Sequence, residues 1–319
     1  MRALVTGASG FVGQWLCREL LERGWEVTGT HLEETIGLGA LGDEARRAVR
    51  WTRCDVLRPD DLQRVVDGAR PEAIFHLAGI SFVPTANADP ARTLEVNVIA
   101  AARLLAEVRR HRAAGTLDPV VLVIGSGEQY GRHDPEEQPL PEGAEQRAQS
   151  IYAASKAAQE IVALEAHRAA GVRVIATRSF NHSGPGQAER FLLPALVRRA
   201  LALRGRHSPS LVLGNTTPVR DFLHVADVVR AYVGLAERGA PGEAYNVASG
   251  VGHSVAAVAE RVLAVAAVGA KLQVDPALVR PVEVPVLIGS PARLQADTGW
   301  APRFTLDTII EDLIRATAQ

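Results

Sequence analysis

Residues 6–13 read Thr6-Gly7-Ala8-Ser9-Gly10-Phe11-Val12-Gly13. They follow a short apolar strand predicted over residues 2–5 and precede a helical pattern with apolar residues on one side. Glycine in this context permits a tight turn, a close approach of the backbone to a pyrophosphate, and close packing of the helix on the strand. The stretch therefore predicts a dinucleotide-binding turn, and a purely structural tight loop is the alternative.

Strands and helices alternate along the next 160 residues. Apolar segments predict strands at 26–30, 49–53, 73–76, 120–124 and 172–177, with helices at 59–66, 90–112 and 151–170. The run 120–124 is wholly apolar, as expected for a strand of a parallel sheet covered on both faces. This order implies right-handed crossovers and an α/β fold with a Rossmann-type doubly wound parallel sheet.

The alternation ends after Arg178, where a loop is followed by a helix expected over 190–203 and then by short elements. We therefore predict an NAD(P)-binding Rossmann domain at 1–178, with a returning segment near 219–248. Residues 179–319 are expected to form mainly a smaller C-terminal α/β lobe that binds the substrate.

The composition is that of an ordinary soluble globular protein. A chain of 319 residues with 47% hydrophobic residues can bury a large core. The net charge of -1, with both signs mixed, argues against nucleic acid or an anionic membrane as the main partner. Two cysteines are too few for a disulfide framework and fit a reducing cytoplasm. A small molecule that carries phosphate remains a suitable partner.

Tyr152 and Lys156 are four residues apart, so both project from one face of the predicted helix. A fixed cation lowers the pKa of a tyrosine from its usual value of about 10, and such a pair can exchange a proton with an alcohol or ketone oxygen. Only Lys156 and Lys271 are lysines among the 35 basic residues, which suggests that Lys156 is retained for its compact ammonium. The alternative is an ordinary surface helix.

Other candidate residues lie where predicted strands end, because ligands bind at the carboxyl ends of such strands. Ser126 could donate a hydrogen bond to the substrate oxygen that Tyr152 protonates, or it is a structural turn serine. Glu128 could act as a base, or it is merely solvated. Asp55 and Val56 could receive the adenine amino group of a cofactor.

The second strand ends at His31, and no acidic residue follows until Glu33. An acid at the strand end would bind the ribose hydroxyls of NAD and repel NADP, so its absence favours NADP, although no arginine stands there either. In the second lobe, Arg220 and Arg280 are placed in loops and are suited to grip a diphosphate. The histidines lack metal-ligand spacing, so no metal site is predicted.

The chain resembles the extended short-chain dehydrogenases/reductases of the nucleotide-sugar epimerase/dehydratase type. The stretches that carry this resemblance are 6–13, 55–56, 76–78, 97–98, 126–131 and 152–156. Residues 178–187 are similar to the corresponding segment of the subfamily that reduces GDP-4-keto-6-deoxymannose, as are residues 219–222, 245–250 and 275–287. Ile151, Glu283 and Ser290 depart from the pattern expected for these relatives.

The resemblance implies an NAD(P)H-dependent reduction at C4 of a nucleotide-linked 4-keto-6-deoxy sugar. It implies that Tyr152 donates the proton, that Lys156 lowers the tyrosine pKa and holds the nicotinamide ribose, and that Ser126 orients the keto oxygen. The substrate-binding residues it implies are Ser126, Asn181, Arg220 and Arg280. The implied cofactor-binding residues are Gly7, Gly10, Phe11, Val12, His31, Asp55, Val56, Leu77, Ala78, Gly79, Asn97, Tyr152 and Lys156.

Three alternatives stay open. A 4,6-dehydratase would use Glu128 to remove the C5 proton, although Gly127 stands where some dehydratases place an aspartate. A 4-epimerase is another, and a non-catalytic redox sensor is the third, disfavoured because the chain keeps Tyr152 and Lys156. The resemblance also implies a homodimer in which the helices at 90–112 and 151–170, bearing small residues such as Ala101 and Ala154, pair across a two-fold axis.

Overall fold

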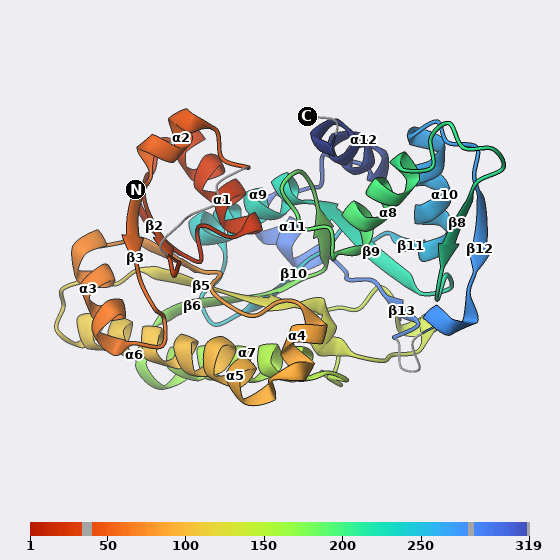
Figure 1. Cartoon of the computed structure of the whole chain (residues 1–319). Helices are drawn as coiled ribbons and strands as arrows, with labels where there is room; N and C mark the ends of the chain where they lie inside the picture. Colours follow the sequence, from red (N-terminus) through yellow and green to blue (C-terminus); the bar gives the residue numbers. More distant parts are fainter. Residues whose placement is uncertain (34–39, 280–283, 318–319) are drawn as a thin grey trace.

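A parallel sheet forms the centre of the molecule (Figure 1), in a computed structural model that describes residues 1–33, 40–279 and 284–317. Within these residues the sheet has seven strands in the order β10-β6-β5-β4-β1-β2-β3. The strands are β1 (Arg2–Thr6), β2 (Glu26–His31), β3 (Arg50–Arg53), β4 (Ala73–His76), β5 (Val120–Ser126), β6 (Arg173–Ser179) and β10 (Ala244–Val247). The predicted doubly wound parallel sheet is confirmed, and its strand order reverses between β1 and β4.

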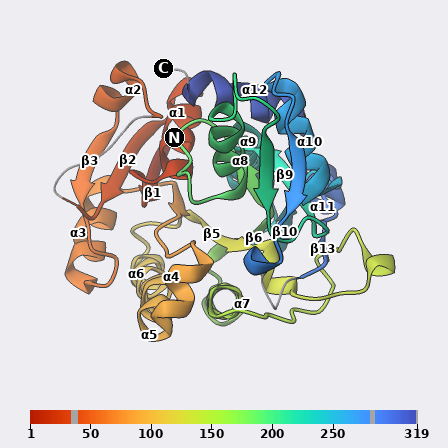
Figure 2. The same cartoon turned by 45° about the vertical axis from the view of Figure 1, so that its right-hand side comes forward.

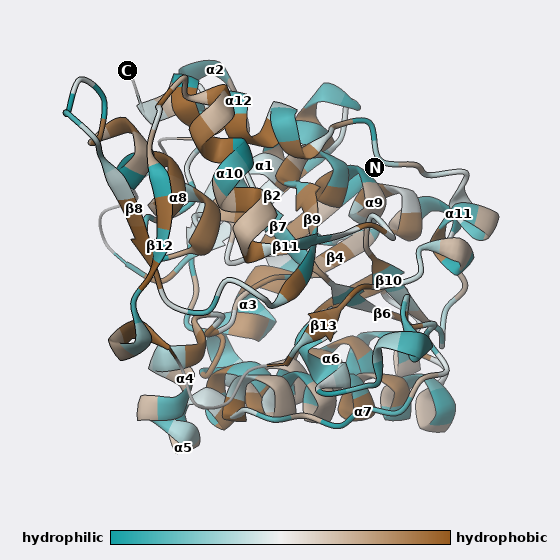
Figure 3. Ribbon diagram, turned by 90° about the vertical axis from the view of Figure 1, so that its right-hand side faces the viewer, coloured by the Kyte–Doolittle hydropathy of each residue, from teal (hydrophilic) through white to brown (hydrophobic). Residues whose placement is uncertain are grey.

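Helices cover both faces of this sheet, on opposite sides of the strands in Figures 1 and 2. One face carries α1 (Phe11–Glu22) and α9 (Val225–Arg238), with the short α2 (Asp43–Ala48) beside α1, whereas the other carries α3 (Pro59–Ala69), α6 (Ala100–Ala113) and α7 (Ile151–Ala170). Along β1, Val5 packs into the first apolar core and Leu4 into the second, and both are fully buried. Because successive strand residues face opposite ways, a central strand presents apolar residues to both faces over much of its length, and β4 is accordingly largely hydrophobic in Figure 3.

The helix expected over residues 90–112 is interrupted. It consists of α5 (Pro90–Leu94), a π-helical turn at Glu95–Ile99, and α6. Asn97 lies within the π turn and is fully buried, and its side chain bonds to neighbouring segments instead of facing solvent. Single π turns inside helices are frequent at functional sites. Before this helix, the short α4 (Val83–Ala88) follows the loop after β4.

The second half of the chain forms a smaller lobe around its own apolar core. Its main sheet has β9 (Val219–His224) between β11 (Gly252–Ser254) and β13 (Val286–Leu287), with β7 (Asn181–Ser183) also paired to β9. A further pair, β8 (Ser210–Leu213) and β12 (Lys271–Val274), lies with helices α8 (Leu192–Leu201), α10 (Val255–Val265) and α12 (Leu306–Thr317). Residues 219–248 were expected to return to the first domain. Within them β10 is a strand of the first sheet and α9 packs on that sheet, whereas β9 belongs to the second sheet. Helix α11 (Ala292–Thr298) packs against α9 and β10.

The loop after β7 joins the two lobes. The indole nitrogen of Trp15, on α1, donates to the carbonyl oxygen of Pro185 at 3.0 Å. The imidazole of His224 meets the Trp15 ring edge-on at 5.5 Å. These contacts hold the loop after β7 and the end of β9 against α1, the helix that follows the glycine turn. Among the described residues, none of the helices combines the length and the apolar content that a membrane span requires.

Candidate active site

The glycine turn lies against the end of β4. Gly7 has φ 69°, and a Cβ there would stand 2.9 Å from the backbone nitrogen of Ala78. A Cβ on Gly13 would stand 2.4 Å from the carbonyl oxygen of Gly7, so this glycine lets α1 approach the turn. Both contacts are with backbone, which cannot move aside at low cost. The resulting cradle at the reversal point of the sheet suits a dinucleotide pyrophosphate.

The predicted adenosine-binding residues lie at the ends of β2 and β3. His31 ends β2, with its Nδ1 2.7 Å from the carbonyl oxygen of Glu33, and Asp55 follows β3 and accepts from the backbone nitrogen of Leu57 at 2.9 Å. The parallel register pairs His31 with Arg53. The sequence offered no arginine at the end of the second strand, but the sheet brings one there from the third.

Ser126 ends β5, and Tyr152 lies in the first turn of α7, which packs against the turn that follows β5. The serine hydroxyl is close enough to the phenol to influence the pKa of Tyr152. Burial raises the pKa of Tyr152 to about 12, the Ser126 hydroxyl opposes this rise, and the negative charge of Glu128 adds to it. The phenol is therefore neutral at physiological pH and has a proton to donate.

Lys156 lies one helical turn beyond Tyr152 on α7 and is 5% exposed. It donates to the carbonyl oxygen of Ile124 at 2.8 Å and to Gln159 Oε1 at 2.9 Å. Burial lowers the pKa of Lys156 to about 8. We expected Lys156 to lower the pKa of Tyr152. Instead, the lysine donates to Ile124 and Gln159, and burial is the main influence on the pKa of the phenol and raises it.

Asn97 connects the cofactor side of the site to α7. Its Oδ1 accepts from the backbone nitrogen of Ile80 at 2.8 Å, and its Nδ2 donates to Ser155 Oγ at 2.8 Å. Ser155 in turn donates to the carbonyl oxygen of Tyr152 at 2.7 Å. A Cβ on Gly79 would lie 2.9 Å from Asn97 Oδ1 and 3.5 Å from Lys156 Nζ, so a side chain at this position would crowd both groups.

Asn181 and Arg220 lie on the adjacent parallel strands β7 and β9 of the second lobe, and both are half-buried. Beside Arg220, the buried Asp221 accepts hydrogen bonds from the backbone nitrogens of Ser249 and Gly250, each at 2.9 Å. Burial raises the pKa of Asp221 despite these bonds. Asp221 therefore fixes β9 to the next loop, while Arg280 lies outside the described residues.

His76, His182 and His224 are held by contacts within the protein. Nδ1 of the buried His76 lies 2.8 Å from Thr6 Oγ1, and burial, followed by the charge of Lys156, lowers the pKa of His76 to about 3. His182 is stacked on Phe11 with the ring centroids 6.4 Å apart. His224 accepts from the backbone nitrogen of Ala226 and caps α9.

A buried polar network behind Ser126 was not anticipated from the sequence. Glu160 and Arg178, each 5% exposed, form a two-pronged ion pair with distances of 2.6 and 2.9 Å. Gln129 joins Glu160 to the backbone of Ser126. The sequence feature that could have pointed to this network is Glu160, which lies four residues beyond Lys156 on the same helical face.

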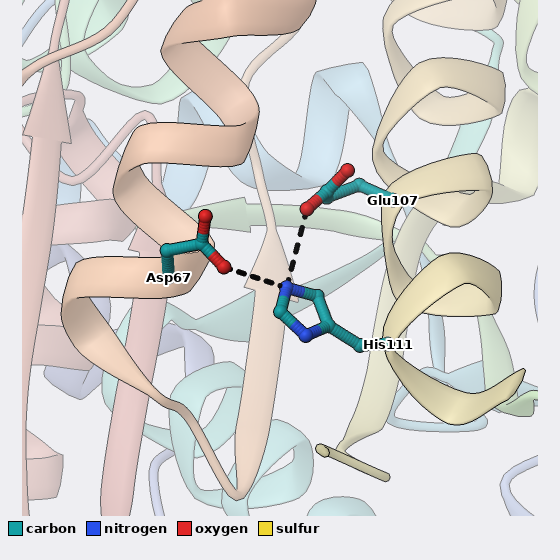
Figure 4. Close-up of side chains that lie close together, drawn as sticks. All are labelled: Asp67, Glu107 and His111. Carbon is teal, nitrogen blue, oxygen red and sulfur yellow. Dashed lines mark ion pairs between the residues drawn. The ribbon is translucent and has the colours of Figure 1, made fainter. Parts of the chain in front are cut away.

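One group of described residues has the chemistry of metal ligands, and it lies away from this site. Asp67 on α3 and Glu107 on α6 flank the Nε2 atom of His111, at 3.0 and 3.2 Å (Figure 4). The guanidinium of Arg110 also pairs with both carboxylates. Part of their negative charge is thus already offset by a cation from the chain.

Comparison with known proteins agrees with this geometry. The chain is 34% identical to the GDP-6-deoxy-D-mannose reductase of Pseudomonas aeruginosa, over 96% of this chain and 93% of that protein. A structure of RMD from the same species complexed with NADPH is 30% identical, with a TM-score of 0.82 over 99% of this chain and 98% of that one. A UDP-glucose 4-epimerase of Thermus thermophilus in complex with NAD is 27% identical, with a TM-score of 0.85 over 100% and 99% of the two chains.

The family model for GDP-mannose 4,6 dehydratase matches residues 4–313, nearly the whole chain. Its relatives include enzymes that bind NADPH and enzymes that bind NAD. The chain therefore belongs to the GDP-mannose 4,6-dehydratase family, which consists of NAD(P)-dependent nucleotide-sugar enzymes of the extended short-chain dehydrogenase/reductase type.

Proposed function

We propose that this enzyme uses NAD(P)H to reduce a nucleotide-linked 4-keto-6-deoxy sugar, specifically GDP-4-keto-6-deoxy-D-mannose to GDP-6-deoxy-D-mannose (GDP-rhamnose). The observation that carries the proposal is the neutral Tyr152 phenol, whose pKa responds to the Ser126 hydroxyl and which shares one side of α7 with the buried Lys156. The name of the Pseudomonas aeruginosa relative supports the same substrate class.

Each residue has a distinct task in this reduction. The nicotinamide, when bound, supplies the hydride. Tyr152 donates its proton to the oxygen at C4, and the Ser126 hydroxyl holds that oxygen in line with the phenol. Lys156 places a positive charge beneath the site, which stabilises the negative charge that develops. Asn181 and Arg220 are assigned to the nucleotide sugar, where a guanidinium suits the diphosphate.

A dehydratase is the second candidate, because Glu128 lies close enough to influence the Tyr152 pKa and could serve as the base. Elimination also requires an acid for the departing hydroxyl, and the position where some dehydratases place an aspartate is Gly127. A Cβ on this residue would lie 3.0 Å from the Phe180 ring. That contact is tighter than an ordinary van der Waals contact, so an acidic side chain is poorly accommodated at 127, which favours the reductase.

We further propose that NADP is the preferred cofactor. Arg53 and His31 are register partners at the ends of β3 and β2, and Arg53 donates to the carbonyl oxygen of Leu32 at 3.3 Å. In such folds the ribose of the adenosine lies at this point, and an arginine there accommodates the 2'-phosphate. The reductase-like structure with NADPH is consistent with this assignment.

A homodimer and a reducing, cytoplasmic location complete the proposal. Leu94, Ile99 and Ile161 are 42%, 44% and 62% exposed and lie on α5, the π turn and α7. Exposed apolar residues on neighbouring helices favour an interface between copies of the chain. Ala101 is buried within the chain and Ala154 is exposed. Cys17 and Cys54 are both free and buried, as suits a reducing compartment.

Purified enzyme supplied with GDP-4-keto-6-deoxy-D-mannose should oxidise one NADPH per sugar reduced, followed by the loss of absorbance of the reduced nicotinamide. Tyr152→Phe removes the proton donor and should lower kcat by roughly 100- to 10,000-fold. Binding of NADPH, measured by its fluorescence, should stay nearly unchanged. Conversion of GDP-mannose without net consumption of NADPH would instead identify a dehydratase.

The pH profile should report Lys156. Its pKa of about 8 means that the ammonium is present below this pH and is lost above it, whereas Tyr152, with a pKa of about 12, stays protonated over the same range. We expect kcat/KM to fall as pH rises through about 8. In Lys156→Arg the cation persists, so this decline should vanish, although the rate is lower. A wild-type profile that is flat from pH 7 to about 9.5 would contradict the assignment.

Arg53→Ala should weaken the use of NADPH without affecting NADH. Loss of a charge-assisted bond to the phosphate is worth about 1.5–3 kcal/mol, or roughly 10- to 150-fold in kcat/KM. The matched control is Arg50→Ala, at the opposite end of the same strand, where the guanidinium donates to the carbonyl oxygen of Gly68. Equal losses with both cofactors would show that Arg53 does not bind the 2'-phosphate.

Light scattering should give twice the 34.1 kDa mass of one chain. Ile161→Glu places a charge on the proposed interface and should produce the single-chain mass at micromolar concentration. Leu278→Glu alters a residue that is 53% exposed elsewhere and should leave the mass doubled. A wild-type mass of one chain would remove the dimer from the proposal.

A further inference from the structure

We propose that Gln129, held by Glu160, is a positioning residue that fixes the Ser126 hydroxyl relative to the Tyr152 phenol. The inference rests on the proposed function, in which these two hydroxyls share the oxygen at C4. It assigns a role in the reaction to a buried network that acts without touching the substrate.

Gln129 is fully buried and forms hydrogen bonds at both ends of its amide group. Its Oε1 accepts from the backbone nitrogen of Ser126 at 2.8 Å, and its Nε2 donates to Glu160 Oε2 at 2.9 Å. The Ser126 hydroxyl accepts in turn from the backbone nitrogen of Glu128 at 3.2 Å, which completes a capping box. A Cβ on Gly125 would lie 2.4 Å from Gln129 Oε1, so the amide fits closely against the strand end. The turn after β5 therefore depends on Gln129 for its orientation.

Glu160 anchors this amide to the helix that carries the proton donor. Tyr152, Lys156 and Glu160 are spaced by four residues, so they lie along one side of α7. The Glu160 carboxylate is held by Arg178, whose Nε and Nη2 donate at 2.9 and 2.6 Å. Burial opposes the charge of Arg178, but its bonds to Glu160 raise the pKa of the guanidinium above its usual value. The carboxylate is thus a fixed acceptor in the interior.

These contacts close a ring. The Ser126 hydroxyl acts on the Tyr152 phenol, the helix leads from Tyr152 to Glu160, and Gln129 leads from Glu160 back to the Ser126 backbone. Breaking the ring at Gln129 frees the turn that presents Ser126 while leaving Tyr152 and Lys156 in place. Because a displacement of about 1 Å costs on the order of 100-fold in rate, the main effect should be on kcat.

Gln146 provides a matched control. Its Nε2 donates to Glu160 Oε1 at 2.8 Å, so it shares the same carboxylate, and its Oε1 accepts from Gln129 at 3.2 Å. Replacing Gln146 thus disturbs the network on the side away from the Ser126 backbone. If the network only stabilises the fold, substitutions at 129 and at 146 should lower kcat to a similar extent. If Gln129 positions Ser126, only the substitution at 129 should lower kcat.

The test compares Gln129→Met, Gln146→Met, Ser126→Ala and the double variant of positions 126 and 129 in steady-state reduction with NADPH. We expect Gln129→Met to lower kcat by roughly 10- to 100-fold with KM nearly unchanged, and Gln146→Met to stay within about threefold of wild type. In the Ser126→Ala background, Gln129→Met should lower kcat by less than about threefold, because Gln129 acts through Ser126. Equal losses in both backgrounds, or equal losses from the two methionine variants, would overturn the proposal.

A second variant covers the case in which Gln129→Met does not fold. Gln129→Glu keeps the acceptor for Ser126 and, when protonated, a donor toward Glu160. Its kcat should approach the wild-type value at low pH and fall as the new carboxyl ionises beside Glu160, in addition to any decline that wild type shows near pH 8. An unchanged pH profile counts against positioning.

Crystal structures separate this inference from the proposed function. If wild-type enzyme reduces no GDP-4-keto-6-deoxy sugar, the proposed function fails, and the separation of Ser126 Oγ and the Tyr152 oxygen still decides the present inference. That separation should change in Gln129→Met and stay as in wild type in Gln146→Met. A wild-type separation in both variants would overturn the positioning role.

Discussion

The buried ion pair between Glu160 and Arg178 is the constraint on which the catalytic side of this enzyme depends. Removing two such charges from water costs several kcal/mol each, and only excellent geometry with further hydrogen bonds offsets that cost. Here both prongs of the guanidinium meet the carboxylate, and Gln129 and Gln146 donate to the same two oxygens. Losing either partner would leave a buried charge uncompensated, a penalty of roughly 3–5 kcal/mol. Consequently β6, α7 and the turn after β5 are restricted to one arrangement.

The opposite side of α7 is restrained by the π turn. Asn97 donates to Ser155, which in turn donates to the backbone of Tyr152. Asn97 also accepts a hydrogen bond from Ile80, the residue after Gly79. The helix that carries Tyr152 is therefore fixed from two directions, by the ion pair of Glu160 on one side and by an amide on the other. A single extra residue in a helical turn is enough to redirect Asn97 inward, and this explains why the irregularity lies beside the site.

The sequence predicted the sheet well because its determinants are local. Three glycines between a strand and a helix, and unbroken apolar runs such as 120–124, suffice to predict parallel strands and the place of Ser126. What it missed depends on pairing between distant segments. Arg53 reaches the end of β2 only through the register with His31, and no spacing announces that contact. The four-residue spacing between Lys156 and Glu160 can be seen in the sequence. The partner of Glu160, Arg178, lies on the next strand, and the sequence alone marks it only as the end of the first domain.

The protonation of Tyr152 distinguishes the reactions that this fold supports. A dehydratase or an epimerase begins by oxidising the sugar, so its tyrosine must start as a base, whereas a reductase must start with a proton to give. In this structure burial raises the pKa of Tyr152 to about 12 and Glu128 increases the shift, while Lys156 is held by Ile124 and Gln159. Both influences favour the neutral phenol. The negative charge of Glu128 thus helps to keep Tyr152 in the protonated form from which the proposed reduction starts.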